Sequence, residues 1–333
     1  MAQGPTKVAV VGAGFMGRQH VESYENIPEA QVAVVVDPQR ERAEELAKAC
    51  GARAETDLDK VLADPEIEVV DICTPTFLHR EQVEKSAQAG KHVICEKPIA
   101  LTVEDAEALV EAARKAGIKF MVAHCLRFWP EYAVAKRILD RGEVGEPLAV
   151  TASRCSPFPG WTWSSWILDP RRSGSATVDL LIHDFDVVSW ILGKPKMVYA
   201  RGLISQRGGV DHAFVVIEHE GGRISHVEGG WFMPQDYGLR MTLKVIATRG
   251  AIEIDNKAEH TLIVHLPGRG PQYPELPTED GYTGELRYFI SCVREDREPT
   301  VITPEDAITA LKTCLAAVRS AQERRPVSLD EVS

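Results

Sequence analysis

Residues 7–17, Lys-Val-Ala-Val-Val-Gly-Ala-Gly-Phe-Met-Gly, decide the fold of the first half of the chain. The apolar run Lys7 to Val11 predicts a buried strand, and the G-x-G-x-x-G string after it opens a helix predicted from Phe15 to about Asn26. A second β-rich run, Gln31 to Val36, ends in Asp37, twenty residues beyond the last glycine of the string. A strand, a glycine turn, a helix and a strand that ends in an acid form the complete dinucleotide-binding fingerprint.

The fingerprint predicts how this part of the chain binds a cofactor. Its glycines let the backbone approach a pyrophosphate at a helix N-terminus, and its acid accepts hydrogen bonds from a ribose. We therefore expect cofactor contacts from Gly12, Gly14, Phe15, Met16, Gly17 and Asp37. The carboxylate of Asp37 repels the 2′-phosphate of NADP, so the sequence favours NAD. NADP is the alternative, because Arg40 and Arg42 follow closely.

Strands and helices continue to alternate up to about residue 123. Three further strands are predicted at 68–73, 92–95 and 118–122, and two helices at 77–89 and 102–116. This alternation predicts an N-terminal Rossmann domain, residues 1–123, with a doubly wound parallel sheet. Ligands of such sheets bind beyond the carboxyl ends of the strands.

Polar residues occupy two of these strand ends. A sharp turn, Cys73-Thr74-Pro75-Thr76, follows one strand, and Glu96-Lys97-Pro98 follows another. We expect the cofactor site to be lined by Thr74, Pro75, His79, Glu96 and Lys97. A helix-start imidazole such as His79 also suits capping or packing. Lys97 stands where a lysine donates to a substrate oxygen, and its bond to Pro98 is a candidate for cis geometry.

After about residue 123 the pattern changes to short strands separated by glycine turns. The β-type runs lie at 148–154, 197–205, 213–219, 224–231, 239–247, 252–255 and 262–265. They predict a C-terminal α+β domain, residues 124–333, with one large and mostly antiparallel sheet. A final helix is expected over 304–323, with Thr303 as its N-cap.

One predicted helix of this half, which begins at Ser173, is apolar nearly all round and still carries ionisable side chains. At about 100° per residue, one narrow face holds Asp179, His183, Asp186 and Trp190. Asp179 and His183 are four residues apart, so they can touch across one turn. Charge in a buried helix is costly unless it is paired or has a function. This leaves two interpretations of Asp179 and His183: a core pair that only satisfies its own hydrogen bonds, or a pair that takes part in the function.

Three tryptophans stand within six residues of the predicted loop before this helix: Trp161, Trp163 and Trp166. Aromatic faces suit the C–H surfaces of sugars, so we expect these rings to contact substrate. Packing of a lid or of a subunit interface is the equal alternative.

The composition excludes several classes of function. The 333 residues predict two domains, and a net charge of −11 without a basic run argues against nucleic acid or a membrane surface as partner. No apolar stretch approaches the ~20 residues of a membrane span, and the start of the chain lacks the apolar core of a signal peptide. Seven cysteines stand singly and the histidines lack metal-ligand spacing, so we expect a cytoplasmic protein without a metal.

Together these motifs resemble the Gfo/Idh/MocA oxidoreductases, relatives of glucose–fructose oxidoreductase and inositol dehydrogenase. The resemblance rests, in family order, on the glycine string at 12–17, Cys73-Thr74-Pro75 with His79, Glu96-Lys97-Pro98, Arg127-Phe128 and Asp179-x-x-x-His183-x-x-Asp186. It implies an open-faced C-terminal sheet, homodimers or homotetramers built through that sheet, and a catalytic set of Lys97, Asp179 and His183. Arg127 joins the three tryptophans as an expected substrate contact.

This chain departs from the family pattern at two places. Relatives often carry consecutive glycines at the position of Gly174-Ser175-Ala176, and a glycine near Leu181. The small residues preserve close approach to a cofactor, whereas the bulk of Leu181 reshapes the substrate pocket. The identity of a relative's substrate therefore does not transfer to this chain.

The resemblance implies hydride transfer from a carbinol carbon to NAD, with a cyclic polyol or a sugar as substrate. His183 is expected to take the hydroxyl proton, Asp179 to orient the imidazole, and Lys97 to stabilise charge on the reacting oxygen. Asp186 is expected to lie behind the site. Three alternatives stay open: an NADPH-dependent keto-sugar reductase, a glycoside hydrolase that uses NAD transiently, and a catalytically silent cofactor-binding regulator.

Overall fold

The computed structural model describes residues 4–160 and 162–333, and the side chain of Trp163 also lies outside the description. The chain divides into two compact units, Met1–Phe128 with Glu279–Ala307 and Trp129–Thr278 with Ile308–Ser333. The first stretch of unit 1 ends at Phe128, shortly after the expected boundary at residues 123 and 124, and the later segment 279–307 also belongs to this unit. This return of the chain was not expected from the sequence.

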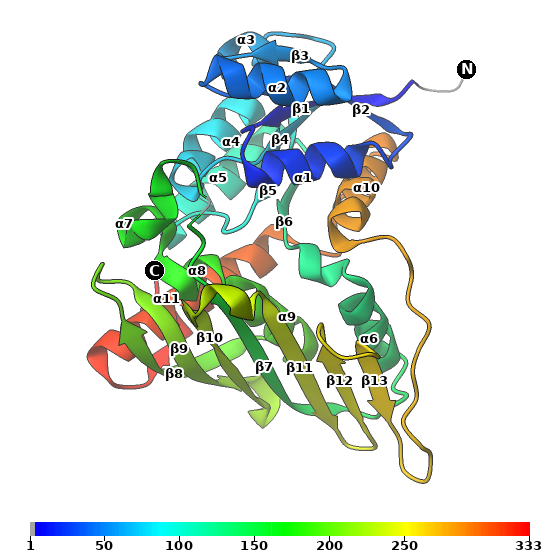
Figure 1. Ribbon diagram of the computed structural model, residues 1–333, viewed down its shortest axis with the longest axis vertical. Helices are drawn as coiled ribbons and strands as arrows, with labels where there is room; N and C mark the ends of the chain where they lie inside the picture. The colour runs from blue at the N-terminus through cyan, green and yellow to red at the C-terminus, as the bar shows by residue number, and fades with distance from the viewer. Residues whose placement is uncertain (1–3, 161) are drawn as a thin grey trace. The chain divides into compact units, whose positions relative to one another are not determined.

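The first unit contains a six-stranded sheet in which every neighbouring pair of strands is parallel (Figure 1). Its strands are β1 (Thr6–Val11), β2 (Ala30–Val36), β3 (Arg53–Glu55), β4 (Val69–Ile72), β5 (His92–Glu96) and β6 (Phe120–Ala123). Their order across the sheet is β3-β2-β1-β4-β5-β6. The order reverses between β1 and β4, which confirms the predicted doubly wound sheet.

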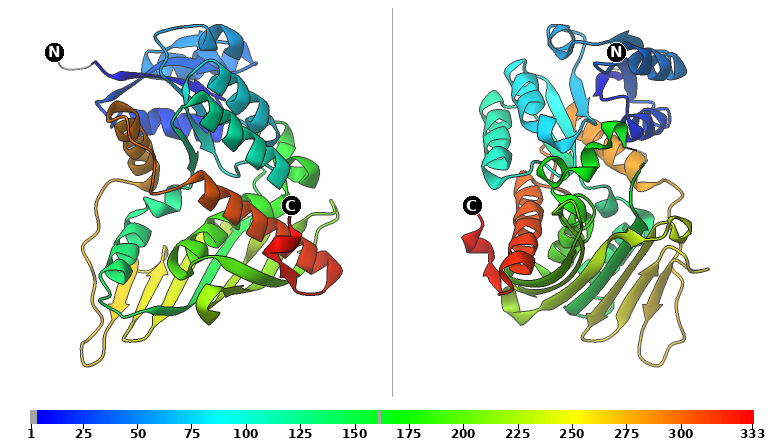
Figure 2. Two further views of the ribbon diagram at one scale, coloured as in Figure 1. Left: turned by 180° about the vertical axis from the view of Figure 1, so that it is seen from behind. Right: turned by 60° about the vertical axis from the view of Figure 1, so that its left-hand side comes forward.

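Helices cover both faces of this sheet (Figure 2). They are α1 (Phe15–Tyr24), α2 (Arg40–Cys50), α3 (Leu58–Leu62), α4 (His79–Gln88), α5 (Val103–Ala116) and α10 (Gly281–Arg294). The central strands are apolar on both sides, and Val8, Val69 and Ile94 have no exposed surface. The chain returns to this unit because α10 buries Leu286 and Phe289 in the same core cluster.

The second unit contains an eight-stranded sheet in which only β7 and β10 pair in parallel. Its strands are β7 (Pro147–Pro157), β8 (Pro195–Ile204), β9 (Val210–His219), β10 (Ile224–Met233), β11 (Arg240–Ala247), β12 (Ala251–Asp255), β13 (Leu262–His265) and β14 (Val327–Ser328). Their order is β13-β12-β11-β7-β10-β9-β8-β14. The mostly antiparallel sheet predicted from the glycine-separated strands is confirmed.

Alternation along these strands gives the sheet two different faces. Val215 and Ile217 of β9 are fully buried, whereas Phe214 and Val216 are 50% and 49% exposed. Helices α6 (Pro130–Asp140), α9 (Ile182–Leu192) and α11 (Pro304–Glu323) lie along the buried face (Figure 2). The other face presents large exposed apolar side chains: Met197, Tyr199, Phe214, Val216, Ile224 and Ile246.

Helix α11 has the bounds expected from the sequence, and the Thr303 hydroxyl accepts a hydrogen bond from the Asp306 N–H at 3.2 Å, as an N-cap does. Among the described residues, no helix combines the length and the hydropathy that a membrane crossing requires.

Candidate functional site

The glycine string forms a tight turn between β1 and α1. Gly12 has a φ of +102°, and a Cβ added there would stand 2.8 Å from the Cys73 carbonyl oxygen. A Cβ on Gly17 would stand 1.8 Å from the Gly12 oxygen, so both positions require glycine. A Cβ on Gly14 meets no atom within 4 Å, and no side chain caps the N-terminus of α1. Open space beside uncapped N–H groups fits an approaching pyrophosphate.

Asp37 follows the end of β2 and is 8% exposed. Its Oδ2 accepts a hydrogen bond from the Ala13 N–H at 3.0 Å, and its Oδ1 accepts one from the Gln39 N–H at 2.8 Å. The acid is thereby fixed against the glycine turn, as an acid that binds a ribose requires. The Arg40 side chain is 65% exposed and lies 3.5 Å from Glu44. These residues fit a dinucleotide without a 2′-phosphate.

The turn after β4 is built around a buried histidine. His79 opens α4 and has no exposed surface. Its Nε2 lies 2.9 Å from the Thr74 carbonyl oxygen and its Nδ1 lies 2.9 Å from the Pro98 carbonyl oxygen. Burial lowers the pKa of His79, and the nearby backbone carbonyl oxygens only partly oppose this. Both ring nitrogens lie against backbone carbonyl oxygens, which supports a packing role, and a contact of His79 with a cofactor stays a prediction.

Lys97 stands at the end of β5 and is half-buried. Its backbone N–H donates to Oε2 of the buried Glu96 at 3.0 Å, and its bond to Pro98 is cis. Thr74, in the neighbouring turn, donates from its hydroxyl to Oε1 of Gln82 at 2.6 Å. Thr74 and Pro75 follow β4, while Glu96 is the last residue of β5 and Lys97 follows it. Because β4 and β5 are adjacent and parallel, these residues lie at the same edge of the sheet.

Arg127 lies in a short 3₁₀ turn and is 5% exposed. One guanidinium nitrogen donates to the Val301 carbonyl oxygen at 2.7 Å and to Oδ2 of Asp306 at 3.1 Å. The charge of Arg127 also lowers the pKa of Asp306 against the opposing effect of burial. One nitrogen of the Arg127 guanidinium thus holds the returning segment through an internal ion pair, and the expected substrate contact of Arg127 stays a prediction.

In the second unit the predicted single helix is interrupted. It consists of α8 (Ser175–Asp179) and α9, which begins at Ile182. The Leu181 N–H donates to the Ala176 carbonyl oxygen five residues back, and this wider turn shifts the helical phase. Asp179 ends α8 and His183 is the second residue of α9, so the single regular helix expected here was wrong. Both side chains are half-buried, and the contact expected between them stays a prediction.

The sequence analysis missed the most deeply buried ion pair of this region. Asp184, next to His183, is 2% exposed, and its Oδ2 accepts a hydrogen bond from Nε of Arg154 on β7 at 2.7 Å. Burial raises the pKa of Asp184, and the guanidinium only partly opposes this. The pair anchors α9 on the sheet. The sequence did contain an indication of a buried charge, because Arg154 follows Val150 and Ala152 at the alternate, buried positions of β7.

The tryptophan loop is described only in part. Trp161 lies outside the described residues, and of Trp163 only the backbone, in a 3₁₀ segment (Trp163–Leu168), is described. Trp166 is partly buried and packs on a cluster of Ile167, Ala176 and Trp231, together with Leu180 from the α8–α9 break. Trp166 therefore connects the loop to the segment that carries Asp179 and His183.

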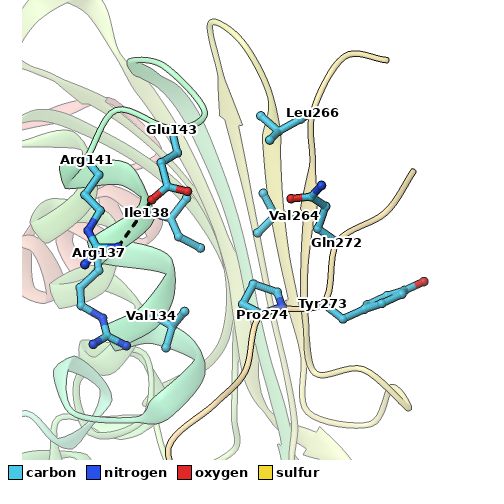
Figure 3. A pocket seen from close by; sticks show the side chains of 10 residues that line it. All are labelled: Val134, Arg137, Ile138, Arg141, Glu143, Val264, Leu266, Gln272, Tyr273 and Pro274. Carbon is cyan, nitrogen blue, oxygen red and sulfur yellow. Dashed lines mark ion pairs between the residues drawn. The ribbon is translucent and has the colours of Figure 1, made fainter. Parts of the chain in front are cut away.

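A surface hollow of about 430 Å³ lies elsewhere in the second unit (Figure 3). Figure 3 shows side chains of α6 facing β13 and the strand-like segment after it, and an ion pair of 3.8 Å between Arg141 and Glu143. None of the residues that we expect to bind cofactor or substrate lines this hollow: Val134, Arg137, Ile138, Arg141, Glu143, Val264, Leu266, Gln272, Tyr273 and Pro274.

Comparison with known proteins identifies both parts of the chain. The family described as "Oxidoreductase family, NAD-binding Rossmann fold" matches residues 6–124, and the "GFO/IDH/MocA C-terminal domain" matches residues 132–253. The scyllo-inositol 2-dehydrogenase (NAD(+)) of Bacillus subtilis is 32% identical over 97% of this chain and 96% of its own length. The myo-inositol 2-dehydrogenase of Thermotoga maritima is 31% identical over 98% of this chain and 99% of its own length.

A solved structure extends the similarity to three dimensions. Levoglucosan dehydrogenase in complex with NADH and levoglucosan superimposes with a TM-score of 0.89 at 25% identity, over 98% of this chain and 99% of that protein. The two matched family models, the full-length relatives and the order of the motifs agree. The chain therefore belongs to the Gfo/Idh/MocA oxidoreductase family.

Proposed function

We propose that the chain is an NAD-dependent dehydrogenase that oxidises a secondary hydroxyl group of a cyclic polyol or a sugar. The observation that carries this proposal is the 32% identity to an NAD-dependent inositol 2-dehydrogenase over nearly the full length of both chains. The glycine turn and the fixed carboxylate of Asp37 support NAD as the cofactor. Bound NAD supplies the hydride acceptor of the reaction.

Three side chains are proposed to carry the chemistry on the substrate. His183 accepts the proton of the reacting hydroxyl, Asp179 orients the imidazole, and Lys97 donates a hydrogen bond to the same oxygen. An ammonium group suits this role because it opposes the negative charge that develops when the hydroxyl proton leaves. Asp186 is 1% exposed, which supports a structural role behind the reacting groups.

The proposal includes a homodimer or homotetramer assembled through the open face of the eight-stranded sheet. The large apolar side chains that stand exposed on that face support such an assembly, because an apolar patch of this kind marks a protein interface. Light scattering that gives the mass of a monomer at micromolar concentration would contradict this part. A cytoplasmic location is also proposed, since all seven cysteines are free thiols.

A panel of inositols and sugars, assayed at 340 nm with NAD and with NADP, tests the proposed reaction. We expect reduction of NAD by at least one cyclic polyol or sugar. Activity only with NADPH and keto-sugars would favour the reductase, and release of a sugar from a glycoside without net NADH would favour the hydrolase. No turnover in any of these assays, with intact NAD binding, would favour the regulator.

A further inference from the structure

A buried polar cluster in the first unit lies outside the proposed catalytic set. Its centre is His20 on α1, which has no exposed surface. The Nδ1 atom of His20 lies 2.9 Å from Oδ2 of Asp71 on β4, and its Nε2 atom lies 3.2 Å from Oε1 of Glu96 on β5. Asp71 is fully buried and Glu96 is 5% exposed. One imidazole thus faces two buried carboxylates, one on each ring nitrogen.

The charges of this cluster favour an imidazolium. Burial by itself lowers the pKa of His20, but Asp71 and the neighbouring Cys73 outweigh burial and hold it well above its ordinary value. Burial raises the pKa of Glu96, and the charges of His20 and Lys97 outweigh it and lower that pKa. A doubly protonated ring donates from Nδ1 to Asp71, while its Nε2 faces Glu96 at ion-pair distance without hydrogen-bond geometry.

Three other titratable groups around the cluster, one on α1 and two on α10, have raised pKa values that favour their neutral forms. Glu285 is fully buried, and neither of its carboxylate oxygens has a hydrogen-bond partner among the described residues. Burial raises the pKa of Glu285 well above its ordinary value, which favours the neutral acid. The hydroxyls of Tyr24 and Tyr282 are neutral as well, because burial raises the pKa of each.

Glu96 connects this cluster to Lys97. Its Oε1 faces His20, while its Oε2 accepts the hydrogen bond from the Lys97 backbone N–H at 3.0 Å. The next carbonyl oxygen, that of Pro98, is bonded by His79. Two buried histidines on two different helices therefore fix the backbone that presents Lys97, one through Glu96 and one directly.

We propose that His20 is a positioning residue for Lys97: held by Asp71, it orients the Glu96 carboxylate that fixes the Lys97 backbone. The proposal rests on the proposed role of Lys97 in the reaction. His20 touches neither substrate nor cofactor in this account. Loss of His20 frees the Glu96 carboxylate to turn and the Lys97 amide to exchange.

His20→Asn is the test variant, and His92→Asn is its matched control. His92 stands on the same strand as Glu96, is half-buried, and accepts a hydrogen bond through Nδ1 from the Lys119 N–H at 3.0 Å, outside the cluster. We expect kcat of the His20 variant to fall at least about tenfold while KM for NAD stays within about threefold, because misplaced catalytic groups lose rate rather than binding. The control should keep kcat within about twofold of the unmodified protein.

Hydrogen exchange of the Lys97 amide provides a readout that does not depend on activity. Pro98 has no N–H, so a peptide covering 96–98 reports on this amide with little interference. We expect Lys97 to lose protection at least about tenfold in His20→Asn and Asp71→Asn, and to keep it in His92→Asn. If no polyol or sugar is oxidised, the proposed function fails while this measurement still tests the positioning.

Three results would overturn the proposal. The first is unchanged Lys97 protection in both cluster variants. The second is an equal loss of kcat in His20→Asn and His92→Asn, which would indicate general destabilisation. The third is a stoichiometric metal ion that His20→Asn loses, because the carboxylates would then be ligands. Should His20→Asn fail to fold, Asp71→Asn and Glu96→Gln provide the same comparison of kcat, KM and exchange.

Discussion

Asp184→Asn tests how the segment that carries His183 is held on its sheet. The carboxylate oxygens of Asp184 lie 2.7 Å and 3.4 Å from two guanidinium nitrogens of Arg154, and the side chains are 2% and 4% exposed. Neutralising one partner leaves a buried charge without its counter-charge, which costs about 3–5 kcal/mol in the free energy of unfolding. For a unit of this size, that cost lowers Tm by about 6–20 °C.

Urea unfolding followed by tryptophan fluorescence measures this loss in the relevant unit. All six tryptophans fall between residues 129 and 231, so the signal reports on the second unit. Asp255→Asn is the matched control, because the pair Arg240–Asp255 joins strands of the same sheet at 2.9 Å with side chains 49% and 28% exposed. We expect the control to lose less than about 1 kcal/mol.

The double variant Arg154→Met/Asp184→Leu separates the loss of a contact from the burial of an unpaired charge. An apolar pair of similar volume avoids the unpaired charge, so the double variant should be more stable than Asp184→Asn. If Asp184→Asn and Asp255→Asn lose the same small amount, the reasoning about buried charge in this unit is refuted.

Three further predictions concern the first unit. Asp37→Ser should lower the NAD-to-NADP ratio of kcat/KM at least about tenfold, because it removes the carboxylate that repels a 2′-phosphate; an unchanged ratio would assign selectivity to other residues. Gly17→Ala should weaken NADH binding at least about tenfold in a fluorescence titration, since its Cβ would stand 1.8 Å from the Gly12 oxygen. Gly14→Ala should leave the free energy of unfolding unchanged, because a Cβ there meets no atom within 4 Å. Glu285→Gln should become more stable relative to the unmodified protein as pH rises above about 4.5. Above that pH the Glu285 carboxyl ionises in the unfolded chain but resists ionisation in the fold, so the unmodified protein loses stability and the variant does not. Parallel curves of the free energy of unfolding from pH 5 to pH 8 would contradict this.

Local patterns predicted much of the fold. The apolar run before Gly12, the glycine string and the acid at position 37 lie close together in sequence, so one stretch specified the strand, the turn and the helix. The second sheet followed from alternation, since Val215 and Ile217 alternate with exposed neighbours along one strand. These features depend on short-range geometry, which a single sequence contains.

The remaining features depend on contacts between distant residues. Arg154 finds Asp184 thirty positions away, and Arg127 pairs with Asp306, which returns with a segment far along the chain. The break at Leu181 could not be read from helical periodicity, because the residues on both sides are equally apolar. His20, buried between Asp71 and Glu96, carried no local motif of its own.

The proposed role of Lys97 in the reaction is tested by hydride transfer in Lys97→Ala, with Lys115→Ala as the control. Lys115 lies on α5 with its side chain 75% exposed, and its substitution should leave kcat unchanged. With the best polyol or sugar of the panel and saturating NAD, we expect kcat of Lys97→Ala to fall by about 10² or more while NADH binding is retained. Near-normal turnover of Lys97→Ala would show that this lysine does not act on the reacting oxygen.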